Sequence, residues 1–122
     1  MNSSTTGLEL LRELASELEH DGPVTIGTMF RSPGIRIGDK IVAFLGHDGR
    51  LIMKLPRARA VELVEAGTAE LVTMGTRTMR EWVELPAGED AEATLATWLP
   101  LAREALQYVR QIAADTEGPR RR

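Results

Sequence analysis

At 122 residues, with 43% hydrophobic and 27% charged residues, the chain has the size and composition of one soluble domain and leaves no room for a second. The absence of cysteine excludes disulfides, thiolate nucleophiles and cysteine-based metal centres, and a net charge of −3 gives no general attraction to nucleic acid or anionic lipid. No stretch approaches the roughly 18 apolar residues of a membrane span, and the start of the chain lacks a signal-peptide pattern. We therefore expect a cytoplasmic protein and no membrane partner.

The N-terminal part of the chain predicts a helix over about residues 7–19. Thr6 and Glu9 have the spacing of a capping box, which satisfies two backbone N–H groups at a helix start. Apolar residues recur at helical spacing at Leu8, Leu11, Ala15 and Leu18. Gly22 and Pro23 then end the helix, because glycine accepts a left-handed cap and proline cannot continue the helix.

Residues 24–55 predict a run of strands. Two apolar stretches, IVAFL and LIMKL, flank a turn that contains Asp48-Gly49, and this is the pattern of a β-hairpin. Residues 24–30 form an earlier strand, and residues 31–34 form the turn after it. Residues 38–40 (Gly-Asp-Lys) interrupt the next stretch, either as a tight turn between two short strands or as a bulge in one long strand.

A second helix and a second hairpin follow. Pro56 suits the first turn of a helix over residues 57–66, which ends at Gly67. The residues expected to face inward on this helix are Ala60, Val61 and Val64. Residues 71–74 and 79–85 then alternate in the manner of paired strands. In the second of these strands one face carries Arg80, Trp82 and Glu84, and the other carries Met79, Glu81, Val83 and Leu85.

The last predicted element is a long helix that Asp90 caps. Its apolar stripe continues to about Ala114, and residues 115–122 form a flexible tail. Pro100 lies inside this pattern, so we expect either a kink there or a helix that begins near Thr97 with the proline in its first turn.

These elements define the fold class. Their order is helix, three strands, helix, two strands, helix, with an ordered core over about residues 7–114. Because the connections between most neighbouring strands are short, the strands pair antiparallel. The sequence therefore predicts a single α+β domain with a mainly antiparallel sheet and helices packed on one face.

The candidate binding residues are Lys54, Arg80 and Trp82, joined by Arg36. If they share one sheet face, they form a basic surface with an aromatic platform that can stack a base or hold a phosphate. The competing interpretation is that the two cations pair with carboxylates such as Glu84 while the tryptophan packs under a helix. This is the commoner role of a strand tryptophan flanked by charges.

No catalytic or metal-binding pattern accompanies these residues. The two histidines, His20 and His47, lack converging ligands or a nucleophile, and a charge at a helix C-terminus explains the first of them. Residues 31–34 lack the spacing of a phosphate loop. We expect no enzyme activity, no cofactor and no metal.

Several short motifs resemble the N-terminal domain of the TfoX/Sxy proteins over about residues 24–100. They are Met29-Phe30, Gly34-Ile35, Gly38-Asp39-Lys40, Ala43-Phe44, Arg50-Leu51, Lys54-Leu55 and the run MREWVEL at residues 79–85. The resemblance implies the YjbR-type arrangement of helix, three strands, helix, two strands and helix. It also implies a regulatory role, since the family is associated with natural competence and its YjbR relatives with suspected DNA binding. The chain departs from the family at residues 31–33, where a glycine pair is usual.

Together these observations predict a non-catalytic regulatory or binding module that acts through a protein partner, given the net acidic charge. Nucleic acid bound at the basic and aromatic residues is the second hypothesis. A third is a small-ligand pocket or weak enzyme between the sheet and the last helix, which a buried polar residue in a cavity would favour. A homodimer through an uncovered sheet face or an edge strand is a further alternative.

Overall fold

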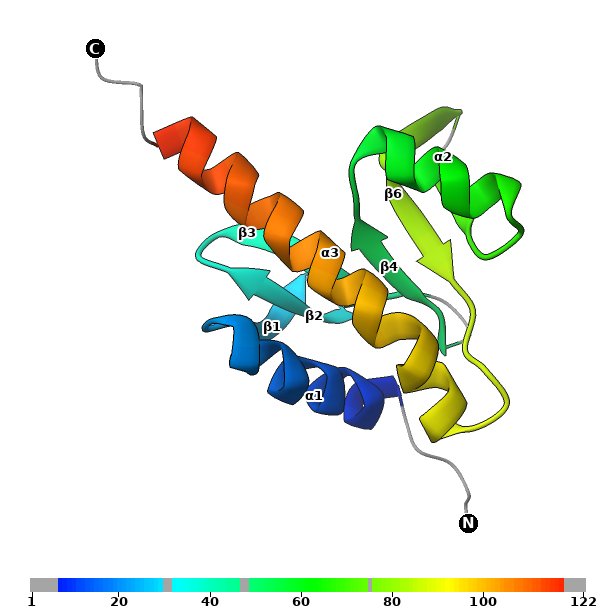
Figure 1. Ribbon diagram of the computed structural model, residues 1–122, viewed down its shortest axis with the longest axis horizontal. Helices are drawn as coiled ribbons and strands as arrows, with labels where there is room; N and C mark the ends of the chain where they lie inside the picture. The colour runs from blue at the N-terminus through cyan, green and yellow to red at the C-terminus, as the bar shows by residue number, and fades with distance from the viewer. Residues whose placement is uncertain (1–6, 30–31, 47–48, 75, 118–122) are drawn as a thin grey trace.

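The computed structural model describes residues 7–29, 32–46, 49–74 and 76–117, and these fold into a six-stranded sheet with helices on one face (Figure 1). The sheet, with every strand pair antiparallel, confirms the predicted α+β class. In chain order the elements are α1 (Gly7–Leu18), the 3-10 helix η1 (Glu19–Asp21), β1 (Thr25–Met29), β2 (Ser32–Ile37), β3 (Lys40–Leu45), β4 (Leu51–Lys54), α2 (Arg57–Glu65), β5 (Glu70–Met74), β6 (Arg77–Leu85) and α3 (Ala91–Glu117).

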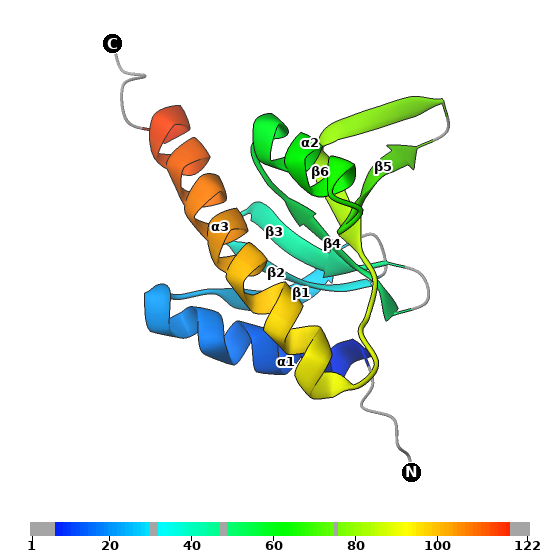
Figure 2. The same cartoon turned by 45° about the vertical axis from the view of Figure 1, so that its right-hand side comes forward.

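The strand order is β1-β2-β3-β4-β6-β5, so β1 and β5 are the two edges. All three α-helices lie on the same side of this sheet, with α3 crossing between α1 and α2 (Figure 2). The register pairs Ala43 with Met53 and Met53 with Val83, and these three side chains are fully buried beneath the helices. Because side chains alternate along a strand, the residues that flank these three in their own strands point to the other face of the sheet, which the described helices leave uncovered.

Four strands precede α2 instead of the three predicted, because Gly38 and Asp39 form a tight turn rather than a bulge. Ile37 pairs directly with Lys40 across this turn, and Gly38 has a φ of 58°, a left-handed conformation that glycine adopts without strain. A bulge is present further along the same pair, where the β2–β3 register shifts between Ile35 and Arg36. The alternative of two short strands is therefore correct.

The turn predicted at residues 31–34 is shorter than expected, since Ser32, Pro33 and Gly34 belong to β2. The ladder between β2 and β3 begins only at Gly34, so Pro33 pairs with β1 alone. Proline lacks a backbone N–H and is tolerated in a strand where one side is unpaired. Phe30 and Arg31 lie outside the described residues.

The inward face of α2 also differs from the expectation. Ala60 and Leu63 are buried, whereas Val61 is 43% exposed and Val64 is half-buried. The helix is short and touches the sheet over one narrow stripe, which the spacing of Ala60 and Leu63 follows. Gly67 ends the helix as predicted, with a φ of 80° and its N–H bonded to the Val64 carbonyl at 3.1 Å.

Helix α3 begins where its predicted cap lies, since the Asp90 Oδ1 accepts a hydrogen bond from the Ala93 N–H at 2.8 Å. Pro100 sits inside the continuous helix, so the alternative start near Thr97 is wrong. The exposed proline removes only one backbone donor, while the cap at Asp90 fixes the first turn. The helix continues to Glu117, beyond the predicted end at Ala114, and residues 118–122 of the predicted tail lie outside the described chain.

Candidate binding site on the uncovered sheet face

The register brings Lys54 and Trp82 together as direct cross-strand neighbours on β4 and β6. Their chain neighbours Met53 and Val83 are buried on the helix side, so the Lys54–Trp82 pair points to the opposite side of the sheet. We name the uncovered surface around this pair the open face. Its residues are Phe44, Ile52, Lys54, Trp82 and Glu84.

An aromatic pair forms the apolar centre of the open face. The rings of Phe44 and Trp82 meet edge to face, with centroids 5.8 Å apart and an interplanar angle of 64°. Ile52, which lies in the strand between them, is only 8% exposed although no described helix covers it. Trp82 itself is half-buried and stands outside the main core, and it lines a groove that Val109 and Ile112 of α3 also line.

Lys54 makes two contacts at the edge of this aromatic pair. Its Nζ lies 5.0 Å from the centroid of the Trp82 ring and 3.3 Å from the Glu81 Oε1. The carboxylate that pairs with Lys54 is therefore Glu81. Glu84, the example of such a partner that was predicted from the sequence, does not pair with it. Lys54 is the last residue of β4, and its flexible side chain can reach past the strand end.

A second ion pair borders the open face. Arg50 Nη1 donates to the Glu84 Oε1 at 3.1 Å and lies 3.6 Å from the Glu70 Oε1. Lys54 and Arg50 are thus each matched by at least one carboxylate. The open face presents an apolar and aromatic centre between balanced charges, rather than a uniformly basic surface.

Of the other two predicted site residues, one lies away from this cluster and the other is described only by its backbone. Arg36 lies on β2, and β3 and β4 separate it from Trp82 in the strand order. The backbone of Arg80 belongs to β6, but its side chain lies outside the described part of the molecule. His20 is exposed in η1, and His47 falls in a segment that the structure does not describe.

A small groove adjoins the open face at the point where β3 and β4 separate. The β3–β4 ladder ends at the pair of Ala43 and Met53, after which β3 follows β2 and β4 follows β6. A groove of about 250 Å³ opens in this fork. Its lining residues are Asp39, Lys40, Ile41, Lys54, Trp82, Val109 and Ile112. A groove of this size accepts one side chain, whereas drug-sized ligands need larger sites.

Glu81 also links the open face to α3 through Tyr108. Burial raises the pKa of the Tyr108 hydroxyl, and a hydrogen bond to the Glu81 carboxylate raises this pKa further. Glu81 therefore holds both the Lys54 ammonium and the tyrosine hydroxyl. Strand alternation predicted that Glu81 shares a face with Val83 and Leu85, but no sequence pattern identified its partner on α3.

We expect the single tyrosine of this chain to ionise at a higher pH than a free tyrosine. Its folded pKa lies above the unfolded value of about 10, so the stability that this difference supplies is complete below that pH and declines as the pH rises through the folded pKa. Absorbance of the phenolate near 295 nm measures the midpoint. Glu81→Gln should lower it only in part, because burial is the larger cause; an unchanged midpoint would exclude the hydrogen bond.

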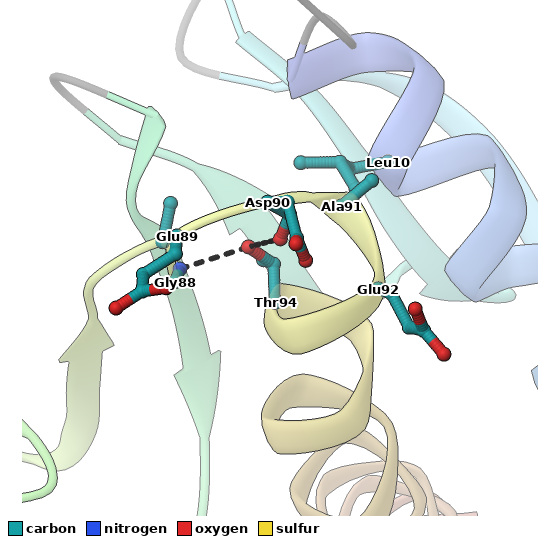
Figure 3. Close-up of a pocket in the computed structure, with 8 residues that line it drawn as sticks. Leu10, Gly88, Glu89, Asp90, Ala91, Glu92 and Thr94 are labelled. Carbon is teal, nitrogen blue, oxygen red and sulfur yellow. Dashed lines mark hydrogen bonds between the residues drawn. The ribbon is translucent and has the colours of Figure 1, made fainter.

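A larger depression of about 590 Å³ lies at the start of α3 (Figure 3). Its buried polar residue, Thr94, already has a partner in each direction, because its hydroxyl accepts from the Gly88 N–H at 2.8 Å and donates to the Asp90 carbonyl at 2.7 Å. The polar group thus serves the helix start and leaves nothing for a ligand. Among the described residues, no cluster of three or more His, Asp or Glu side chains could hold a metal ion.

Comparisons of this chain with models of protein families, with curated proteins and with solved structures found no match. None of the helices within residues 7–117 combines the length and the apolar character that a bilayer crossing requires.

Proposed function

We propose that this chain is a non-catalytic binding module that acts on a protein partner through the open face. The observation that carries the proposal is the half-buried Trp82, which stands edge to face with Phe44 and lines the fork groove. Tryptophan is the residue type most enriched at the energetic centres of protein interfaces. A regulatory role, as the TfoX resemblance implies, and a cytoplasmic location remain part of this proposal.

The balance of charge favours protein over nucleic acid as the partner. Glu81 neutralises Lys54, and Glu84 and Glu70 face Arg50, so a phosphate backbone would meet carboxylates beside both of these cations. An apolar centre with charged pairs at its rim is the usual anatomy of a protein interface. The small volume of the fork groove supports a binding surface rather than a substrate pocket.

Nucleic acid is the second candidate, and one contact favours it. The Lys54 ammonium over the Trp82 ring offers a base a stacking surface and a phosphate a cation at the same place. This candidate requires Lys54 to leave Glu81 on binding, and it predicts a strong dependence on salt.

A charge reversal at Lys54 tests both candidates. Immobilised wild type, Lys54→Glu and the control Arg57→Glu, which makes the same change on the exposed surface of α2, are incubated with extract of cells that carry the protein. We expect a protein that wild type and Arg57→Glu retain equally and that Lys54→Glu retains about tenfold less, because the new carboxylate repels Glu81 and removes the cation from the open face. Quantitative mass spectrometry measures retention.

The same three proteins are titrated against labelled single- and double-stranded DNA and RNA by fluorescence anisotropy at two salt concentrations. We expect no salt-sensitive binding. If such binding is present and Lys54→Glu abolishes it, nucleic acid replaces protein as the partner. Equal retention of every protein by all three variants would show that the open face does not bind a protein partner. Far-ultraviolet circular dichroism confirms that each variant is folded.

A further inference from the structure

The two edges of the sheet differ in how they are protected. Edge strands expose unpaired backbone groups, and natural proteins protect them with charges, prolines, bulges or a covering element. Each edge strand contacts one helix, β5 contacting α2 and β1 contacting α1, but β5 also begins with Glu70 and carries a register shift between Leu71 and Val72. Strand β1, with the sequence TIGTM, has no charge and no proline, and its register with β2 is regular over all five residues. Strand β1 is thus the edge that is open to pairing.

A free cation lies across this edge. The side chain of Arg36 extends from β2 over Gly27 of β1, and its Nε, Cζ and Nη2 atoms lie 3.5, 3.6 and 3.7 Å from the point that a Cβ at Gly27 would occupy. The guanidinium therefore lies at van der Waals distance above Gly27. Arg36 is exposed and, among the described residues, makes no hydrogen bond or ion pair. A guanidinium carries five donors that match a carboxylate.

The side-chain pattern of β1 fixes what an added strand must present. Such a strand would lie about 4.8 Å beyond β1, and its residue opposite Gly27 would point to the same side as Arg36. Its residues opposite Ile26 and Thr28 would point to the helix side. Ile26 is 39% exposed there, one of three large apolar side chains exposed in the described chain.

We propose that the β1 edge binds an extended strand of a partner protein, with a carboxylate opposite Gly27 that Arg36 binds and an apolar side chain beside Ile26. Backbone pairing supplies the contact, and the carboxylate sets the register. A second copy of this chain fits less well, because antiparallel pairing about Gly27 would place two Arg36 guanidinium groups against each other. This site goes beyond the proposed open face, since it uses neither Trp82 nor Lys54.

The test uses a fluorescein-labelled decapeptide with a central Val-Glu-Val, and a matched peptide with Val-Gln-Val. We expect saturable anisotropy with the glutamate peptide and about tenfold weaker binding of the glutamine peptide, since a hydrogen bond to a charged group is lost. Arg36→Glu should show the same loss and should recover binding to a Val-Lys-Val peptide. Hydrogen exchange should slow at Thr25–Met29 on binding.

Ile26→Lys should abolish binding, because a lysine on an edge strand opposes strand addition. Val61→Lys is its control, since Val61 is exposed to a similar degree (43% against 39%) on α2. Trp82→Ala should bind the peptide as the wild type does. Failure of the open-face proposal can therefore be distinguished from failure of the proposal for the β1 edge. Equal binding of both peptides, no binding to wild type, or slowed exchange away from β1 would overturn the inference. The inference would also be overturned if the wild type does not bind the peptide but self-associates, and if Ile26→Lys converts it to a monomer in sedimentation.

Discussion

Trp98→Ala is expected to lower the free energy of unfolding by about 3–5 kcal/mol, a large part of the roughly 5–15 kcal/mol that holds a domain folded. Trp98 is the largest fully buried side chain, with 0% of its surface exposed. Its Nε1 donates to the Pro86 carbonyl at 3.2 Å, which ties α3 to the segment that leaves β6. Truncation would leave a cavity between helix and sheet and an unpaired carbonyl.

Urea denaturation followed by far-ultraviolet circular dichroism measures this loss. Trp98→Phe serves as the control for volume, because it keeps an aromatic ring in the core and removes only the hydrogen bond and the second ring. We expect its loss to be smaller than that of Trp98→Ala. If Trp98→Ala unfolds at nearly the wild-type urea concentration, α3 does not pack on the sheet as described.

Local patterns predicted most of the elements because each has a local physical cause. The apolar spacing of α1 and the cap at Asp90 act within a few residues, and both were confirmed except at Leu8, which is 37% exposed. Strand alternation correctly placed Trp82 and Glu84 on one face and Val83 on the other. The errors lie where tertiary pairing decides, as at Pro33, whose tolerance in β2 depends on where the β3 ladder begins.

Which residues make up the candidate site depends on contacts between segments that are far apart in the sequence, and no local sequence pattern indicates these contacts. Arg36 shares a face with Trp82 by alternation, but the strand order puts two strands between them. The pairing of Lys54 with Glu81 arises because Lys54 ends β4, and the fork groove arises because β3 and β4 part after Met53. None of these facts has a local signature, since each requires knowledge of which strands are neighbours.

Trp82→Ala is expected to have the opposite profile to Trp98→Ala, with folding retained and partner binding lost. Trp82 is half-buried at the surface, so the expected loss of stability is about 1–2 kcal/mol, from the contact with Phe44 and the partial burial. A tryptophan at the centre of an interface contributes at least about 2 kcal/mol, which corresponds to roughly thirtyfold in affinity. Binding to the protein that wild type retains and Lys54→Glu loses should therefore weaken by that factor or more.

Trp82→Phe separates an interface role from a structural one. Phenylalanine can keep the edge-to-face contact with Phe44 but has a smaller surface for a partner and for the Lys54 ammonium. We expect near wild-type stability with an affinity between those of wild type and Trp82→Ala, measured by isothermal titration and by urea denaturation. If affinity instead follows stability across the two variants, Trp82 supports the sheet and the partner binds elsewhere. If stability is kept while affinity falls stepwise from Trp to Phe to Ala, the aromatic surface itself makes the contact.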